Sequence, residues 1–268
     1  MTYSRFSGRA ATLYTMLALG YAFLYLPILL LVIYSFNASR LVTVWGGFST
    51  HWYAELMHDD KVLDAAWLSL KVAVVTATLA TVLGTLASVL LVRFKRYPGS
   101  TLFAGMVAAP LVMPEIITGL AMLLMFVSME QVIGWPAGRS MTTIVIAHCT
   151  FCLSFVTVVV RSRLAQMDMS LEEAAMDLGA RPLKVFLVIT LPLIAPALLA
   201  GWLLAFTLSV DDLVISSFVT GPAATTLPIV IFSKVRLGVS PEINALASVF
   251  VAVVGVAIAL GGTLSRKT

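Results

Sequence analysis

The chain has 268 residues, of which 60% are hydrophobic and 11% charged, and its formal net charge is +4. Soluble domains average about 45–50% apolar and 25% charged residues, so the composition indicates an integral membrane protein. Polar stretches stay below the roughly 50 residues at which independent soluble domains begin. We therefore expect a single transmembrane domain over residues 1–268, in contact with membrane lipid and not with nucleic acid.

Apolar runs of about 20 residues, the length that crosses a bilayer as a helix, occur six times. The first follows Arg5 and Arg9 and is longer than the roughly 7–15 apolar residues of a signal peptide, so we expect an uncleaved span. The predicted fold is all-α and polytopic, with six spans at residues 12–36, 66–92, 102–128, 142–160, 192–210 and 243–263.

The 17 Lys and Arg residues divide unevenly between the two sides of this topology. Cytoplasmic connections carry an excess of Lys and Arg. One side holds Arg5, Arg9, Arg93, Lys95, Arg96, Arg161, Arg163, Arg181, Lys184, Arg266 and Lys267. The other side holds Arg40, Lys61, Lys71, Arg139, Lys234 and Arg236. This bias predicts that both termini, and the loop at about residues 164–191, are cytoplasmic.

The first outer loop contains aromatic and ionisable side chains with two possible roles. Trp45, near Arg40, could form a cation–π wall on a substrate path or anchor the chain at the membrane interface. His51 and His58 flank Glu55, which is compatible with a metal cluster, but a solvated helix end that faces an outer partner is favoured.

Glu115 falls in the middle of the third predicted span, directly after Pro114. Proline lacks an N–H group, so we expect the helix to bend there. An ionisable residue inside a membrane is costly, and a role on the substrate path is the default hypothesis. The alternatives are an ion pair with a partner subunit and a simple interface location at a helix end.

Cys149 and Cys152 lie with His148 inside the fourth predicted span. A C-x-x-C pair suggests a metal or redox site, but this spacing in an apolar helix also places two small hydrophobic residues on one face. Two thiols and one imidazole are too few for a closed zinc site, so we predict no metal.

The loop between the fourth and fifth spans has the pattern of two helices joined by a tight elbow. Ser170 stands three residues before Glu173, the spacing of a capping box. Gly179 stands where the first helix would end, and Pro182 suits the first turn of a second helix that we expect to end at Pro192. The first helix would carry an apolar stripe of Leu171, Ala174, Ala175 and Leu178, with Glu172, Glu173 and Asp177 on its other faces. A solvated linker is the alternative.

Asp211 and Asp212 follow the fifth span, about 22–24 Å along a helix that starts at Pro196. The apolar run at residues 213–219 is too short for another span and suggests a broken helix that lines a cavity. Two adjacent carboxylates at membrane depth repel each other unless a cation lies nearby, which a dicationic amine would provide. Pairing with a partner subunit is the alternative, and Ser209 could hydrogen-bond along the path or cap a helix.

The loop sequence resembles the EAA loop of the permeases of binding-protein-dependent ABC importers. The matching pattern is Glu173-Ala174-Ala175, three residues, Gly179, nine residues, Ile189, one residue and Leu191-Pro192. In that family the loop forms a coupling helix that docks on the ATP-binding subunit. The resemblance implies this role for Glu173, Ala174, Ala175, Asp177, Leu178 and Gly179. Residues 34–37, 113–116, 211–218 and 225–228 resemble the polyamine-import subgroup, above all the second permease subunits of putrescine importers.

The resemblance implies a bacterial inner-membrane permease that moves a polyamine, with putrescine favoured, by alternating access. The implied partners are a second permease subunit in a heterodimer, two copies of a cytoplasmic ATP-binding subunit and a periplasmic substrate-binding protein. The sequence contains no G-x-x-x-x-G-K-[ST] loop, so we expect no cofactor or catalytic site in this chain, and ATP and Mg to be used by the partner ATPase. The alternatives are a permease for spermidine or another cation, and an ion-coupled secondary transporter that uses the same carboxylates.

Overall fold

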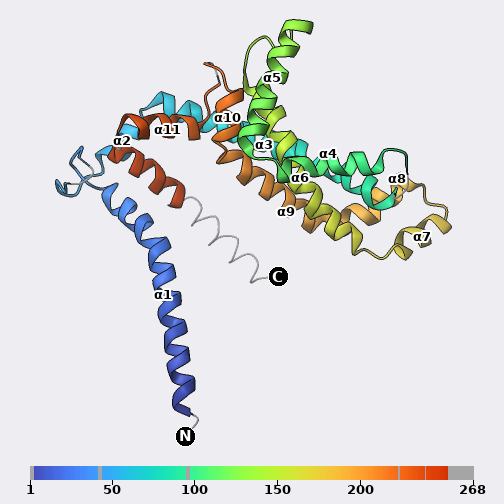
Figure 1. Ribbon diagram of the computed structural model, residues 1–268, viewed down its shortest axis with the longest axis horizontal. Coiled ribbons are helices and arrows are strands. Elements are labelled where there is room, and N and C mark those ends of the chain that lie inside the picture. The colour runs from blue at the N-terminus through green and yellow to red at the C-terminus, as the bar shows by residue number, and fades with distance from the viewer. Residues whose placement is uncertain (1–2, 42–43, 95–96, 223, 239, 253–268) are drawn as a thin grey trace. The chain divides into compact units, whose positions relative to one another are not determined.

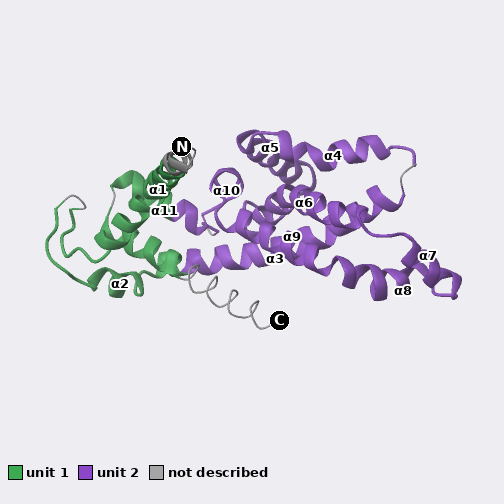
Figure 2. Cartoon of the chain, turned by 90° about the horizontal axis from the view of Figure 1, so that it is seen from below, with its two compact units in different colours: residues 1–63, 231–268 green, residues 64–230 purple. Residues whose placement is uncertain are grey.

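The computed structural model describes residues 3–41, 44–94, 97–222, 224–238 and 240–252, and these residues fold almost entirely into helices. This confirms the all-α prediction. The chain divides into two compact units, residues 1–63 with 231–268 and residues 64–230 (Figure 2).

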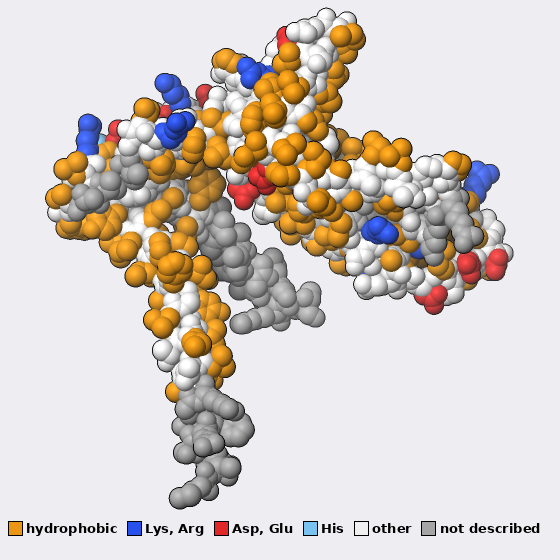
Figure 3. Space-filling model, in the orientation of Figure 1, with side chains coloured by type: hydrophobic (Ala, Val, Ile, Leu, Met, Phe, Trp, Pro, Cys, Tyr) orange, Lys and Arg blue, Asp and Glu red, His pale blue; other side chains and the backbone are white. Residues whose placement is uncertain are grey.

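The first unit contains α1 (Tyr3–Tyr34), α2 (His51–Leu56) and most of α11 (Leu227–Leu237), followed by a helix over residues 241–252. None of the residues in the most apolar window of Ala10–Tyr34 is buried within the chain. Figure 3 shows this part of α1 covered with hydrophobic side chains. A helix that is apolar all round is stable only in lipid or against another subunit.

The second unit contains most of α3 (Asp60–Arg93) and the chain from α4 (Ser100–Val112) to α10 (Val214–Val219). At its centre lies α6 (Met141–Ala165), against which α9 (Leu191–Val210) packs along its length (Figure 1). Two glycines allow neighbouring helices to approach α6 closely: a Cβ at Gly201 of α9 would lie 3.2 Å from Val156 Cγ1, and one at Gly84 of α3 would lie 2.9 Å from it. Small residues let membrane helices approach closely, which replaces the missing hydrophobic driving force.

Five helical segments of the described chain are long and apolar enough to cross a membrane: Ala10–Tyr34, Asp60–Arg93, Glu115–Ile133, Met141–Ala165 and Pro182–Val210. They correspond to the first five predicted spans. The sixth, at residues 243–263, coincides with the helix over 241–252 and otherwise lies outside the described residues.

The third predicted span is not one helix, which corrects the expectation for residues 102–128. The chain forms α4 and then α5 (Glu115–Ile133), with a break at Met113 and Pro114. Met113 is extended, with ψ of 134°, because a residue before proline is pushed out of the helical region. The break is therefore sharper than the bend predicted from the same proline.

The helix after the elbow was also predicted wrongly, because it does not end at Pro192. The helical path runs from α8 (Pro182–Val185) through a π-helical segment, η1 (Phe186–Thr190), into α9. The N–H of Leu191 bonds to the carbonyl of Phe186, five residues back. This wider turn relieves the clash that a proline ring makes with the preceding turn, so Pro192 is accommodated inside the helix.

Candidate functional site

The elbow between α7 (Ser170–Asp177) and α8 has the geometry that the sequence predicts. Gly179 has φ of +85°, the left-handed conformation that favours glycine. The N–H of Gly179 bonds to Met176 O at 2.9 Å, and that of Ala180 to Ala175 O at 3.1 Å. This pair of bonds is a Schellman motif, and it satisfies carbonyls that the helix end would leave unpaired. Pro182 begins α8, as expected.

The start of α7 differs from the predicted capping box. Ser170 is the first residue of the helix and its side chain makes no cap. Asp168 takes the capping role, since its Oδ1 accepts a hydrogen bond from the Ser170 N–H at 3.0 Å. This bond to the charged form lowers the pKa of Asp168. Glu173 is exposed and makes no reciprocal bond among the described residues.

The predicted apolar stripe of α7 is exposed. Leu171 is 49% and Leu178 90% exposed, Ala174 is exposed, and Ala175 is partly buried. Asp177 is exposed on the same helix, and Figure 3 shows acidic side chains gathered where Figure 1 places α7. Most of the stripe is therefore left uncovered by the described part of the chain.

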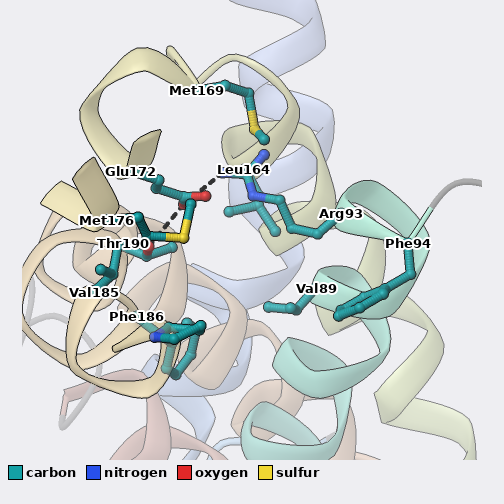
Figure 4. Close-up of a pocket in the computed structure, with 11 residues that line it drawn as sticks. Val89, Arg93, Phe94, Leu164, Met169, Glu172, Met176, Val185, Phe186 and Thr190 are labelled. Carbon is teal, nitrogen blue, oxygen red and sulfur yellow. Dashed lines mark hydrogen bonds and ion pairs between the residues drawn. The ribbon is translucent and has the colours of Figure 1, made fainter. Parts of the chain in front are cut away.

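The buried side chain of α7 is Glu172, a residue that the sequence reasoning gave no specific role. Its Oε1 lies 2.8 Å from Arg93 Nη2 and accepts a hydrogen bond from Thr190 Oγ1 at 2.7 Å. A mostly apolar cavity of about 320 Å³ adjoins these three side chains (Figure 4). No local signal could have revealed the pair, because 79 residues separate its members.

Asp212 lies in a second polar cluster, between the end of α9 and the start of α10. Its Oδ2 lies 3.1 Å from His148 Nε2 on α6, and the two side chains are 6% and 2% exposed. The carboxylate also accepts the N–H groups of Ile215 at 3.3 Å and Ser216 at 2.7 Å. Asp212 thus caps α10 and joins it to α6.

Ser209 belongs to the same cluster and not to an open path. Its Oγ lies 2.8 Å from His148 Nδ1, and Ser216 Oγ lies 2.9 Å from Nε2 of the same ring. With the proton on Nε2, the imidazole can donate to Asp212 and accept from Ser209. The sequence reasoning considered His148 only as a metal ligand, although an ionisable residue inside a span is itself a signal for a polar partner.

Asp211 is oriented differently from its neighbour: it is exposed and forms no ion pair in the described part of the chain. The short helix α10 that follows confirms the predicted broken helix, and it packs on α5 and α6. Its approach to α5 is close, because a Cβ at Gly119 would lie 2.6 Å from Phe218 Cδ2.

Glu115 is the first residue of α5 and is exposed, so its predicted position in the middle of a span is wrong. A carboxylate at the first turn is favourably placed relative to the helix dipole, which lowers the cost of its charge. It makes no ion pair with another described residue.

Trp45 lies in the first unit, in a loop organised by the buried side chain of Asn37. Asn37 Oδ1 accepts the Gly46 N–H at 2.7 Å, and its Nδ2 donates to Val44 O at 2.8 Å. Trp45 is half exposed and packs edge-on against Tyr34, with 6.0 Å between the ring centroids. The Asn37 hydrogen bonds to Val44 and Gly46 thus hold the backbone on both sides of this indole.

The cysteines and histidines form no metal-ligand group of three or more side chains among the described residues. Cys149 and Cys152 are buried free thiols, and Cys152 Sγ contacts Ala205 O at 3.6 Å. His51 contacts Glu55 at 3.4 Å, and His58 Nδ1 contacts Ala54 O at 2.7 Å, so each ring has a local partner.

A bundle of apolar helices that exposes a short amphipathic helix on a polar elbow is the architecture of a polytopic membrane protein. Residues 80–266 match the family described as "Binding-protein-dependent transport system inner membrane component". The chain belongs to this family, and it is a multi-pass inner-membrane protein.

Curated relatives extend the similarity over most of the chain. The putrescine transport system permease protein PotI of Escherichia coli (strain K12) is 62% identical over 240 residues, which cover 90% of this chain and 85% of PotI. The spermidine/putrescine transport system permease protein PotC of the same strain is 45% identical over 229 residues, which cover 85% of this chain and 84% of PotC.

Solved structures share the fold at low sequence identity. A bacterial ABC transporter that imports the acidic polysaccharide alginate has a chain with a TM-score of 0.75 and 17% identity, with coverage of 100% of this chain and 99% of that chain. The MetNI methionine ABC transporter, in an inward-facing conformation, gives a TM-score of 0.58 at 16% identity, with coverage of 77% and 94%.

Proposed function

We propose that this chain is the transmembrane permease subunit of an ATP-driven importer that moves putrescine into the cytoplasm by alternating access. The observation that carries the proposal is the 62% identity to a putrescine permease over 90% of the chain. The exposed stripe of α7 supports it, because a permease without its own nucleotide site needs a surface that receives movement from an ATPase.

The coupling surface would consist of Glu173, Ala174, Ala175, Asp177, Leu178 and Gly179. Small side chains allow a helix to enter a groove, and exposed Leu178 offers an apolar anchor. Two copies of a cytoplasmic ATPase, which use ATP and Mg, would bind this permease and a second permease subunit. A periplasmic binding protein would deliver the substrate from the other side, with both termini of this chain cytoplasmic.

The substrate path would pass Asp211 and Glu115, the two exposed carboxylates of this region, and the indole of Trp45. Exposed carboxylates can bind the ammonium groups of a diamine, and an aromatic face can bind a cation during its passage. Ser209 and Asp212 would hold the broken helix in place through His148, so that Asp211 remains free.

A spermidine importer is the second candidate, favoured by the 45% identity to a spermidine/putrescine permease. Carboxylates bind either amine, so geometry alone does not distinguish them. Family membership disfavours the ion-coupled carrier, which would need neither an ATPase nor a binding protein.

The test is uptake of labelled putrescine into proteoliposomes that contain the complete complex, assembled with its ATPase, second permease and binding protein. We expect uptake to require both ATP and the binding protein, and excess spermidine to compete weakly. Uptake driven by an ion gradient without ATP would refute the proposal. Preferential uptake of spermidine would retain the importer and change its substrate.

A further inference from the structure

The docking helix α7 is attached to the rest of the chain in an unusual way. All eight of its residues are described, and Glu172 alone among them is buried. Leu171 points outward, and Met176 is 42% exposed although it lines the cavity beside Glu172. Burial of a carboxylate is costly unless the charge is paired and hydrogen-bonded. Glu172 therefore needs its polar partners, and these contacts tie α7 to the rest of the second unit.

Both contacts end on one atom, Glu172 Oε1, and they lead to different membrane helices. Arg93 is the last residue of α3, and its side chain is 13% exposed, against 11% for Glu172. Thr190 is the last residue of the π-helical segment, directly before α9, and it is buried. The two charges also suit their helix ends, since Glu172 lies in the first turn of α7 and Arg93 in the last turn of α3.

The surroundings strengthen this pair. Figure 4 shows Glu172 between Arg93 and Thr190 in a cavity whose other walls come from apolar side chains such as Val89, Leu164 and Phe186. Apolar walls offer no other partner to Arg93 or to Glu172. Separating these two side chains would therefore leave each charge without its partner in apolar surroundings.

We propose that Glu172 is a positioning residue, a pivot that ties α7 to α3 through Arg93 and to α9 through Thr190. A displacement of α7 then moves both membrane helices together. This inference rests on the proposed coupling function of α7, and it adds a residue inside the permease to the surface that would contact the ATPase.

The experiment compares variants in the reconstituted complex and measures putrescine taken up per ATP hydrolysed. Glu172→Gln keeps the shape of the side chain and removes its charge, and Arg93→Gln does the same for its partner. In both, we expect assembly and ATP hydrolysis to continue and uptake per ATP to fall about tenfold. Arg93→Lys, which retains the charge, should recover most of the ratio.

Two controls separate a pivot from general damage. Arg161→Gln removes an exposed arginine that forms no ion pair within the described chain, and it should leave the ratio unchanged. Thr190→Val removes one hydrogen bond and leaves the ion pair intact, so we expect a decrease of roughly threefold that Thr190→Ser restores.

A wild-type ratio in Glu172→Gln would overturn the proposal. If that variant does not assemble, Thr190→Val decides, and a wild-type ratio there would equally overturn it. Failure of the wild-type complex to show ATP-dependent uptake would refute the proposed function itself, which is a different result.

Discussion

Replacing Asp212 by Asn should lower the stability of the fold, whereas replacing Asp211 by Asn should lower transport and leave stability almost unchanged. Asp212 accepts two backbone N–H groups and contacts His148, all within 3.3 Å. Asparagine has one acceptor oxygen and no charge, so one or two charge-assisted bonds are lost, which should cost about 2–4 kcal/mol of stability. Asp211 is exposed and lacks an ion pair in the described chain, so Asp211→Asn should change stability by less than about 0.5 kcal/mol.

Thermal unfolding in detergent measures the loss of stability in Asp212→Asn. A thiol reagent can follow the unfolding, because Cys149 and Cys152 are buried in the folded protein and become reactive when it unfolds. His148→Ala should destabilise the protein as Asp212→Asn does, and the double variant should lose less than the sum of the two, since both remove one interaction. Uptake of labelled putrescine measures the effect of Asp211→Asn on transport. Asp211→Asn should weaken putrescine transport by about tenfold to a hundredfold, the value of a hydrogen bond to a charged group.

The reasoning would be refuted by the reverse pattern. If Asp212→Asn folds with wild-type stability and loses transport, its carboxylate binds substrate instead of His148. If Asp211→Asn transports normally, the substrate path lies elsewhere, and Glu115→Gln becomes the next variant to measure.

Three further outcomes are expected. Gly179→Ala places a side chain at φ of +85°, at a local cost of about 1–2 kcal/mol, and should uncouple ATP hydrolysis from uptake. Gly99→Ala is the control, because Gly99 also has φ of +85° and open space around it, and this variant should remain coupled. A cysteine introduced by Gln166→Cys should resist an impermeant reagent added outside intact cells, while one introduced by Met57→Cys should react; labelling of the first would reverse the topology. Burial disfavours both charges of the Lys234–Asp59 pair, yet their polar contacts together outweigh it: Lys234 and the Val62 N–H lower the pKa of Asp59, and Asp59 and Glu242 raise the pKa of Lys234. Stability should therefore fall as acid pH passes through the lowered pKa of Asp59, and again as alkaline pH passes through the raised pKa of Lys234; Lys234→Met should remove about 1 kcal/mol and abolish both changes in thermal unfolding.

The parts of the molecule that the sequence predicted correctly depend on local chemistry. The left-handed Gly179, the start of α8 at Pro182 and the lengths of the apolar helices all follow from residues within one or two turns. The short helix after Asp212 follows equally from a run too short to cross a membrane. In each case the backbone has few alternatives, because proline, glycine and chain length restrict it directly.

The errors arise where two local signals compete. Pro114 could bend a long helix or break it, and the apolar composition on both sides favoured a single span. Pro192 could end a helix or lie within it, and the π-helical segment at Phe186–Thr190 makes the second possible. Composition alone cannot decide such cases, since packing against neighbouring helices contributes as much as the local preference.

The polar contacts between distant segments could not be predicted at all. Glu172 meets Arg93 across 79 positions, and His148 meets Ser209 across 61. The sequence shows that these polar groups lie among apolar residues, where an unpaired polar group is costly, so each needs a partner. It does not identify the partner, because that choice depends on how the helices pack in three dimensions.

The two polar clusters lie at opposite ends of one helix, and this arrangement connects α7, the proposed docking helix, with Asp211 and Asp212. Thr190 bonds to Glu172 just before α9 begins, and Ser209 contacts His148 just before it ends. The 19 intervening steps span about 28 Å at 1.5 Å per residue, close to the roughly 30 Å of a bilayer core. Apolar contact does not favour helix association in lipid, so polar contacts and close packing must fix each end. We therefore expect a shift imposed on Thr190 to reach Asp211 along α9, with some of it absorbed where Pro196 lets the helix bend.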